Sequence, residues 1–125
     1  MRSSIAIYLL GAACLAVIAL VLYTLGLSGL ALWNTAPVAV VFMVGACASR
    51  HSTVPGRAFA VAFASVVLAA VAWGHLSWVL SPPTGRGSST AVIAFVFWPI
   101  YATVAGVMVA LVPWIIARIM RRQNI

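Results

Sequence analysis

The sequence predicts an all-α integral membrane protein, a four-helix transmembrane bundle with both termini in the cytoplasm. Hydrophobic residues make up 66% of the 125 residues and charged residues only 6%. The apolar residues form four long runs, and the charged residues are arginines near the ends of these runs. A soluble domain of this size needs a polar surface that this composition does not supply. We therefore expect a bilayer as the solvent and one transmembrane domain over residues 1–125.

The first predicted helix covers about residues 5–25. This run matches the roughly 20 residues that cross a hydrocarbon core of about 30 Å. Ala12 and Ala16 share a stripe of small residues, which suits close packing against another helix. A competing interpretation is a lipoprotein signal cleaved near Gly11 to Cys14. It fits less well, because the apolar run continues beyond that point.

The second predicted helix covers about residues 29–49. Gly45 lies on its small-residue stripe, which also carries Asn34. Asn34 allows two interpretations. It is either the cap of a helix that begins at Thr35, or a residue within the bilayer that bonds to a neighbouring helix.

Residues 50–57 contain two arginines and a Pro-Gly pair, which predict a loop. The third predicted helix follows, over about residues 58–80, with His75 near its far end. Ionisable residues inside membranes are candidates for function. We expect His75 to be an interfacial side chain bonded to water or backbone. The alternative is a haem ligand paired with His75 of a second copy.

The fourth predicted helix covers about residues 90–118, after a loop rich in proline, glycine and serine. Its residues sort by size at about 100° per residue, with Ala102, Gly106 and Ala110 on one stripe and bulky residues opposite. A helix that is flat on one side can bring its backbone close to a partner helix. We expect this stripe to be a packing face.

The arginines predict the orientation. With four spans, the N-terminus, the loop of residues 50–57 and the C-terminus lie on the same side of the membrane. That side carries six of the seven arginines: Arg2, Arg50, Arg57, Arg118, Arg121 and Arg122. Only Arg86 lies on the other side, so the positive-inside rule places both termini in the cytoplasm. The last three arginines of the chain are also the expected contacts of anionic lipid headgroups.

The absence of aspartate and glutamate excludes several kinds of chemistry. Paired-carboxylate catalysis, a Ser-His-Asp triad and a carboxylate proton relay all need residues that this chain lacks. Cys14 and Cys47 lie in different apolar runs, and we expect both to be small buried residues rather than a disulfide or a metal pair. No catalytic, metal or cofactor site is predicted, and nucleic acid is not an expected partner despite the net charge of +7.

Two functions remain compatible with these features. The first is a non-enzymatic protein that acts through helix–helix interaction with another membrane protein or with itself. It would be an accessory subunit of a membrane complex, or an immunity-type protein against a pore-forming toxin. The alternative is an oligomeric transporter or channel for a lipophilic or anionic solute. The arginine-, alanine- and valine-rich composition suggests a bacterial inner membrane.

The predicted orientation is tested by cysteine labelling from the periplasmic side. A cysteine placed at Gly87 should be modified, and one placed at Thr53 should be spared, because the two positions lie on opposite sides of the membrane. The reverse labelling pattern would overturn the orientation. A free external N-terminus would restore the signal-peptide interpretation.

Overall fold

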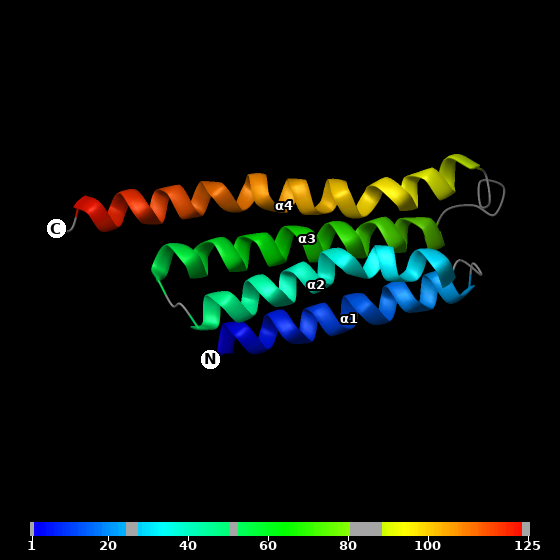
Figure 1. The fold of residues 1–125 in the computed structure, drawn as a ribbon, viewed down its shortest axis with the longest axis horizontal. Helices are drawn as coiled ribbons and strands as arrows, with labels where there is room; N and C mark the ends of the chain where they lie inside the picture. The colour runs from blue at the N-terminus through cyan, green and yellow to red at the C-terminus, as the bar shows by residue number, and fades with distance from the viewer. Residues whose placement is uncertain (1, 25–27, 51–52, 81–88, 124–125) are drawn as a thin grey trace.

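The computed structural model describes residues 2–24, 28–50, 53–80 and 89–123, and all of these except Thr53 are helical. The helices are α1 (Arg2–Thr24), α2 (Ser28–Arg50), α3 (Val54–Leu80) and α4 (Ser89–Gln123). They run up and down in sequence, as Figure 1 shows, and the described residues contain no strand. The prediction of an all-α chain with four helices is confirmed for this part of the chain.

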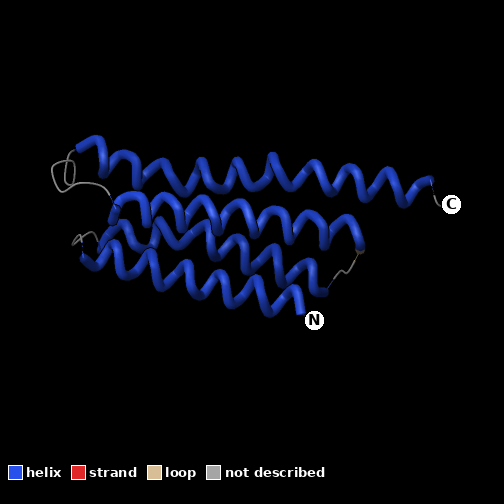
Figure 2. The backbone as a smooth tube through the Cα atoms, turned by 180° about the vertical axis from the view of Figure 1, so that it is seen from behind, coloured by secondary structure: helices blue, strands red, loops and turns tan. Residues whose placement is uncertain are grey.

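Both chain termini lie at one end of the bundle, together with the ends of α2 and α3 that follow one another in sequence (Figures 1 and 2). Arg50, in the last turn of α2, and the arginines of the last turns of α4 therefore share that end. Arg86 lies outside the described residues. Arg50 and the arginines at the end of α4, which the sequence pattern assigns to one side of a membrane, thus lie at one end of the bundle.

The third helix begins earlier than the sequence predicted. Residues 50–57 were expected to form a loop, but α2 continues to Arg50 and α3 begins at Val54. Thr53 caps α3, since its Oγ1 accepts a hydrogen bond from the backbone N–H of Gly56 at 3.3 Å. Pro55 lies in the first turn, where the lack of a backbone N–H costs no hydrogen bond because the first N–H groups of a helix have no acceptor within it. The Pro-Gly pair therefore starts a helix here instead of forming a turn.

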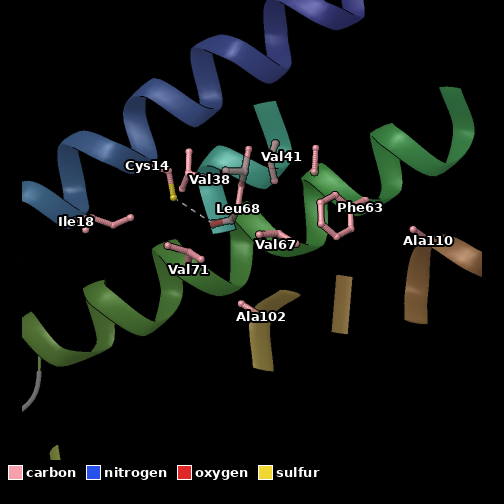
Figure 3. Packing of buried hydrophobic residues seen from close by; sticks show 11 residues of the cluster. Cys14, Ile18, Val38, Val41, Phe63, Val67, Leu68, Val71, Ala102 and Ala110 are labelled. Atoms are coloured by element: carbon pink, nitrogen blue, oxygen red, sulfur yellow. Dashed lines mark hydrogen bonds between the residues drawn. The ribbon is translucent and has the colours of Figure 1, made fainter. Parts of the chain in front are cut away.

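α2 and α3 form the middle of the bundle, because each packs against the other three helices, and the most extensive contact is that of α3 with α4. α4 packs on α3 and α2, while α1 packs on α2 and α3. The core contains side chains from all four helices (Figure 3). Its buried members are Cys14, Ile18, Val38, Val41, Phe63, Ala64, Val67, Leu68, Val71, Ala102 and Ala110.

Small residues of α4 allow its backbone to approach α3. Ala102, Gly106 and Ala110 are buried, and Ala110 is 0% exposed. A Cβ added at Gly106 would collide with Cγ2 of Val67 and lie 3.1 Å from the ring of Phe63. Met108, on the opposite face, is 65% exposed. The approach of α4 to α3 therefore depends on the missing side chain at Gly106.

We predict that Gly106→Leu destabilises the bundle, by roughly 1–3 kcal/mol or more, because overpacking displaces Val67 and Phe63. The matched control is Met108→Leu, which changes an exposed side chain of similar size and should cost little. Thermal unfolding in detergent measures the loss of stability in each of the two variants. Equal losses in the two variants would show that α4 does not pack through this face.

Candidate functional site

Polar side chains are buried near the end of the bundle opposite the two termini. Asn34 is 0% exposed and His75 is 1% exposed. Asn34 lies in the second turn of α2, and His75 lies five residues before the end of α3. The first turns of α2 and the last turns of α3 lie at the same end of the bundle in Figure 1, so Asn34 and His75 both lie towards that end. We call these two residues and Trp78 of α3, which share this end of the bundle, the polar cluster; the name describes their position along the helices and not a contact between them.

Asn34 does not cap α2, because that helix begins at Ser28 and Asn34 is inside it. Its side-chain Nδ2 donates to the carbonyl of Leu30, one turn earlier, at 3.0 Å. Its Oδ1 is buried and has no hydrogen-bond partner among the described residues. The capping interpretation is therefore wrong, and the amide oxygen faces the bundle interior.

The ring of His75 is enclosed between helices and is bonded to backbone, as one part of the expectation stated; its depth in a membrane stays a prediction. Its Nδ1 lies 2.8 Å from the carbonyl oxygen of Val71. A carbonyl only accepts, so Nδ1 carries the hydrogen and the neutral ring presents a lone pair at Nε2. That Nε2 is buried without a partner among the described residues. The ring also packs against that of Phe95, with 5.4 Å between the two centroids.

Trp78 completes the polar cluster from one turn further along α3. Its indole ring meets Phe95 edge-on, at 5.1 Å between centroids and an interplanar angle of 70°. Its Nε1 is a buried donor without a partner in the described part of the chain. A small cavity of about 140 Å³ lies beside it, bounded by Gly74 and Trp98 among others.

The polar cluster thus contains two buried acceptors, Asn34 Oδ1 and His75 Nε2, and one buried donor, Trp78 Nε1. Each of these groups is able to form a hydrogen bond with a buried water. Acid/base catalysis with a carboxylate is impossible here. Among the described residues no group of three or more histidine, cysteine, aspartate or glutamate side chains is placed to hold a metal ion. Both cysteines are free thiols, and Cys47 is exposed, which corrects the expectation that it is buried.

Of the small residues expected to lie at helix–helix contacts, some are buried in the bundle and others are exposed. Gly45 is buried like the small residues of α4, but Ala12 and Ala16 are exposed. The buried face of α1 is instead formed by Gly11, Cys14 and Ile18. A Cβ at Gly11 would collide with the ring of Phe42, so this face is the one that approaches α2. Small size alone did not show which side of α1 faces inward.

Two tryptophans tie helices together in a way that the sequence did not indicate. Trp98 Nε1 donates to the carbonyl of Ala70 at 2.9 Å, which joins α4 to α3. The ring fits there because Gly74 has no side chain, and a Cβ at Gly74 would collide with it. Trp33 Nε1 donates to the carbonyl of Val96 at 2.7 Å, which joins α2 to α4.

The arginines at the end of α4 line a second site. A cavity of about 400 Å³ lies between the last turns of α4 and the start of α3. Its lining residues are Thr53, Pro55, Trp114, Arg118, Arg121 and Arg122. The guanidinium carbon of Arg118 lies 5.1 Å from the ring centroid of Trp114, a cation–π contact. We call this site the basic pocket.

Comparison of the chain with protein-family models, with curated proteins and with solved structures finds no match. By length and composition, two segments of the described helices are able to cross a membrane, Val54–Trp78 and Ile93–Gln123. Tyr8–Leu20 in α1 is apolar but shorter.

We predict that His75→Leu leaves thermal stability unchanged or raises it by up to about 1 kcal/mol. Leucine has a similar volume and removes a buried nitrogen that lacks a partner. The control is Val71→Ala, one turn earlier in the same core, which should lower stability by roughly 1–3 kcal/mol. A loss in His75→Leu as large as that of the control would reveal a bound hydrogen-bond partner at Nε2.

Proposed function

We propose that this chain is a small bacterial inner-membrane protein that acts through helix–helix contact with another membrane protein. In this proposal it crosses the bilayer four times, with both termini in the cytoplasm, and it is not an enzyme. It serves either as an accessory subunit of a membrane complex or as an immunity-type protein against a pore-forming toxin. Anionic lipid headgroups balance its arginines.

The observation that carries the proposal is the small-residue stripe of α1 on the outside of the bundle. Ala12, Ala16 and Ala19 are all exposed, and they lie on the side of α1 away from its buried residues. Tyr8 and Tyr23 lie near the two ends of this stripe and are also exposed. Small residues in lipid let another helix approach closely, and van der Waals packing then favours association. Inside the bundle this surface has no helix to contact.

The outer face of α4 adds a second uncovered surface. Large apolar side chains line it, and they are about half exposed or more. They are Phe97, Tyr101, Val104, Met108, Val112, Ile115 and Ile119. α4 contacts only α2 and α3 extensively, so lipid or a partner helix must cover this face in a membrane. Such a face gives shape-dependent contact but no polar path for an ion.

Solute transport receives less support. Conduction of ions usually needs rings of charge or carbonyl groups, and coupling to protons usually needs a carboxylate. One feature favours the alternative of a lipophilic solute. An apolar groove of about 250 Å³ lies between α2 and α4, with Trp33, Pro37, Pro99 and Ile100 along it.

The test is gentle extraction of tagged protein from its native membrane, followed by mass spectrometry of the co-purifying chains. We expect a stoichiometric foreign subunit. Ala16→Leu should reduce its recovery roughly tenfold, because a wedge in a close interface costs 1–3 kcal/mol. Ala13→Leu is the control, since Ala13 is also exposed on α1 but lies about 100° from the centre of the stripe.

Equal recovery with Ala16→Leu and Ala13→Leu would exclude the α1 stripe as the contact surface. A homo-oligomer without a foreign subunit, which in liposomes passes an anion or a lipophilic cation, would favour the transporter instead.

A further inference from the structure

The basic pocket gathers three positive charges on one face of one helix. Trp114, Arg118, Arg121 and Arg122 are spaced four, three and one residues apart, so they follow one side of the last turns of α4. Each later arginine lies three or four residues from Arg118, a spacing at which like charges destabilise a helix. The cation–π contact with Trp114 holds the guanidinium of Arg118 in place.

The start of α3 adds to the positive potential of the basic pocket. Thr53 and Pro55 line it, so the N-terminus of α3 faces the arginines. The aligned peptide dipoles of a helix place partial positive charge at this end. Thr53 Oγ1 accepts from Gly56 N–H, which leaves the hydroxyl hydrogen of Thr53 able to donate.

No side chain of the protein can neutralise this charge. The chain has no aspartate and no glutamate at any position. Elsewhere in proteins, neighbouring arginines are held together by carboxylates or by bound anions. The side chains of this protein therefore offer no carboxylate to the basic pocket, which leaves its arginines able to bind an external anion.

We propose that the basic pocket binds a phosphate group, with Arg118, Arg121 and Arg122 as its charged contacts and Thr53 as a hydroxyl donor. The guanidinium fork matches the oxygens of a phosphate and forms two parallel hydrogen bonds with it. A cavity of about 400 Å³ holds a phosphate together with the group esterified to it. The proposal concerns this site alone and does not depend on the partner proposed for α1.

An anionic lipid is the source of phosphate that the surroundings favour. Trp114 lies at the inner edge of the basic pocket, where tryptophan commonly marks the level of lipid headgroups. Ile115 is exposed at the level of Trp114, and Leu111 is exposed about one turn closer to the middle of α4. Acyl chains would lie against such a surface while the headgroup phosphate enters the pocket. A soluble phosphate ester would use the same arginines without the apolar contacts.

The experiment is native mass spectrometry of the full chain in a mild neutral detergent, titrated with phosphatidylglycerol or with phosphatidylcholine. We expect phosphatidylglycerol to bind more tightly. Arg118→Gln, Arg121→Gln and Arg122→Gln should each weaken it about fivefold, the factor that corresponds to about 1 kcal/mol per arginine. Arg50→Gln and Arg57→Gln are the matched controls. They remove the same charge at the same end of the bundle, outside the pocket, and should weaken binding less than twofold.

A second arm replaces the lipid with glycerol 1-phosphate. Binding of this soluble ester, lost in Arg118→Gln but not in Arg57→Gln, would support the site with a soluble ligand. Equal weakening of phosphatidylglycerol binding in all five variants would overturn the proposal, because net charge alone would then explain it. Equal affinity for phosphatidylglycerol and phosphatidylcholine, with no binding of the soluble ester, would also overturn it.

Discussion

The close approach of α4 to α3 is the contact on which the arrangement of this bundle depends. α3 packs against all the other described helices, as α2 also does, and its contact with α4 is the most extensive in the bundle. α4 reaches it through residues with little or no side chain. In a bilayer, burial from water does not favour helix association, so van der Waals contact at short range must do so. Phe63 and Val67 fill the space that Gly106 leaves open. The same shape match recurs where the ring of Trp98 lies over Gly74 and that of Phe42 over Gly11.

Polar contacts between helices supplement this packing at few points. The two indole bonds, from Trp33 to Val96 and from Trp98 to Ala70, are directed at backbone carbonyls. An indole N–H that is buried usually finds such an acceptor. Trp78 is different, because its Nε1 joins Asn34 Oδ1 and His75 Nε2 as buried atoms without a described partner. The indoles of Trp33 and Trp98 thus join helices through hydrogen bonds, whereas the Nε1 of Trp78 makes none among the described residues.

The sequence predicted the number of helices and their order well, because long apolar runs separated by polar residues leave few alternatives in lipid. It also separated the two faces of α4, where large and small residues alternate with helical periodicity. It did not show which side of α1 faces inward, because small residues occur on more than one side of that helix. Ala12 and Ala16 share a stripe in sequence, yet the inward side of α1 is set by Gly11, because Phe42 needs that space.

The polar sites were harder to predict than the fold. Asn34 and His75 were identifiable as polar residues in apolar runs, but their burial depends on which way each helix is turned in the bundle. Thr53 and Trp114 carry no sequence signal for the basic pocket, because they lie 61 positions apart and meet only through the packing of α3 on α4.

The unequal lengths of the two long apolar segments have a consequence for the way the protein would lie in a membrane. Ile93–Gln123 has 31 residues and Val54–Trp78 has 25, a difference of about 9 Å along the helix axis at 1.5 Å per residue. Both exceed the roughly 20 residues that a bilayer of ordinary thickness requires. The extra residues of the longer segment include Arg118, Arg121 and Arg122, so the part of α4 before these charges is about as long as Val54–Trp78. In a bilayer the two helices would match one hydrocarbon thickness, and the last turns of α4 would protrude into the headgroup region instead of forcing a tilt or thicker lipid.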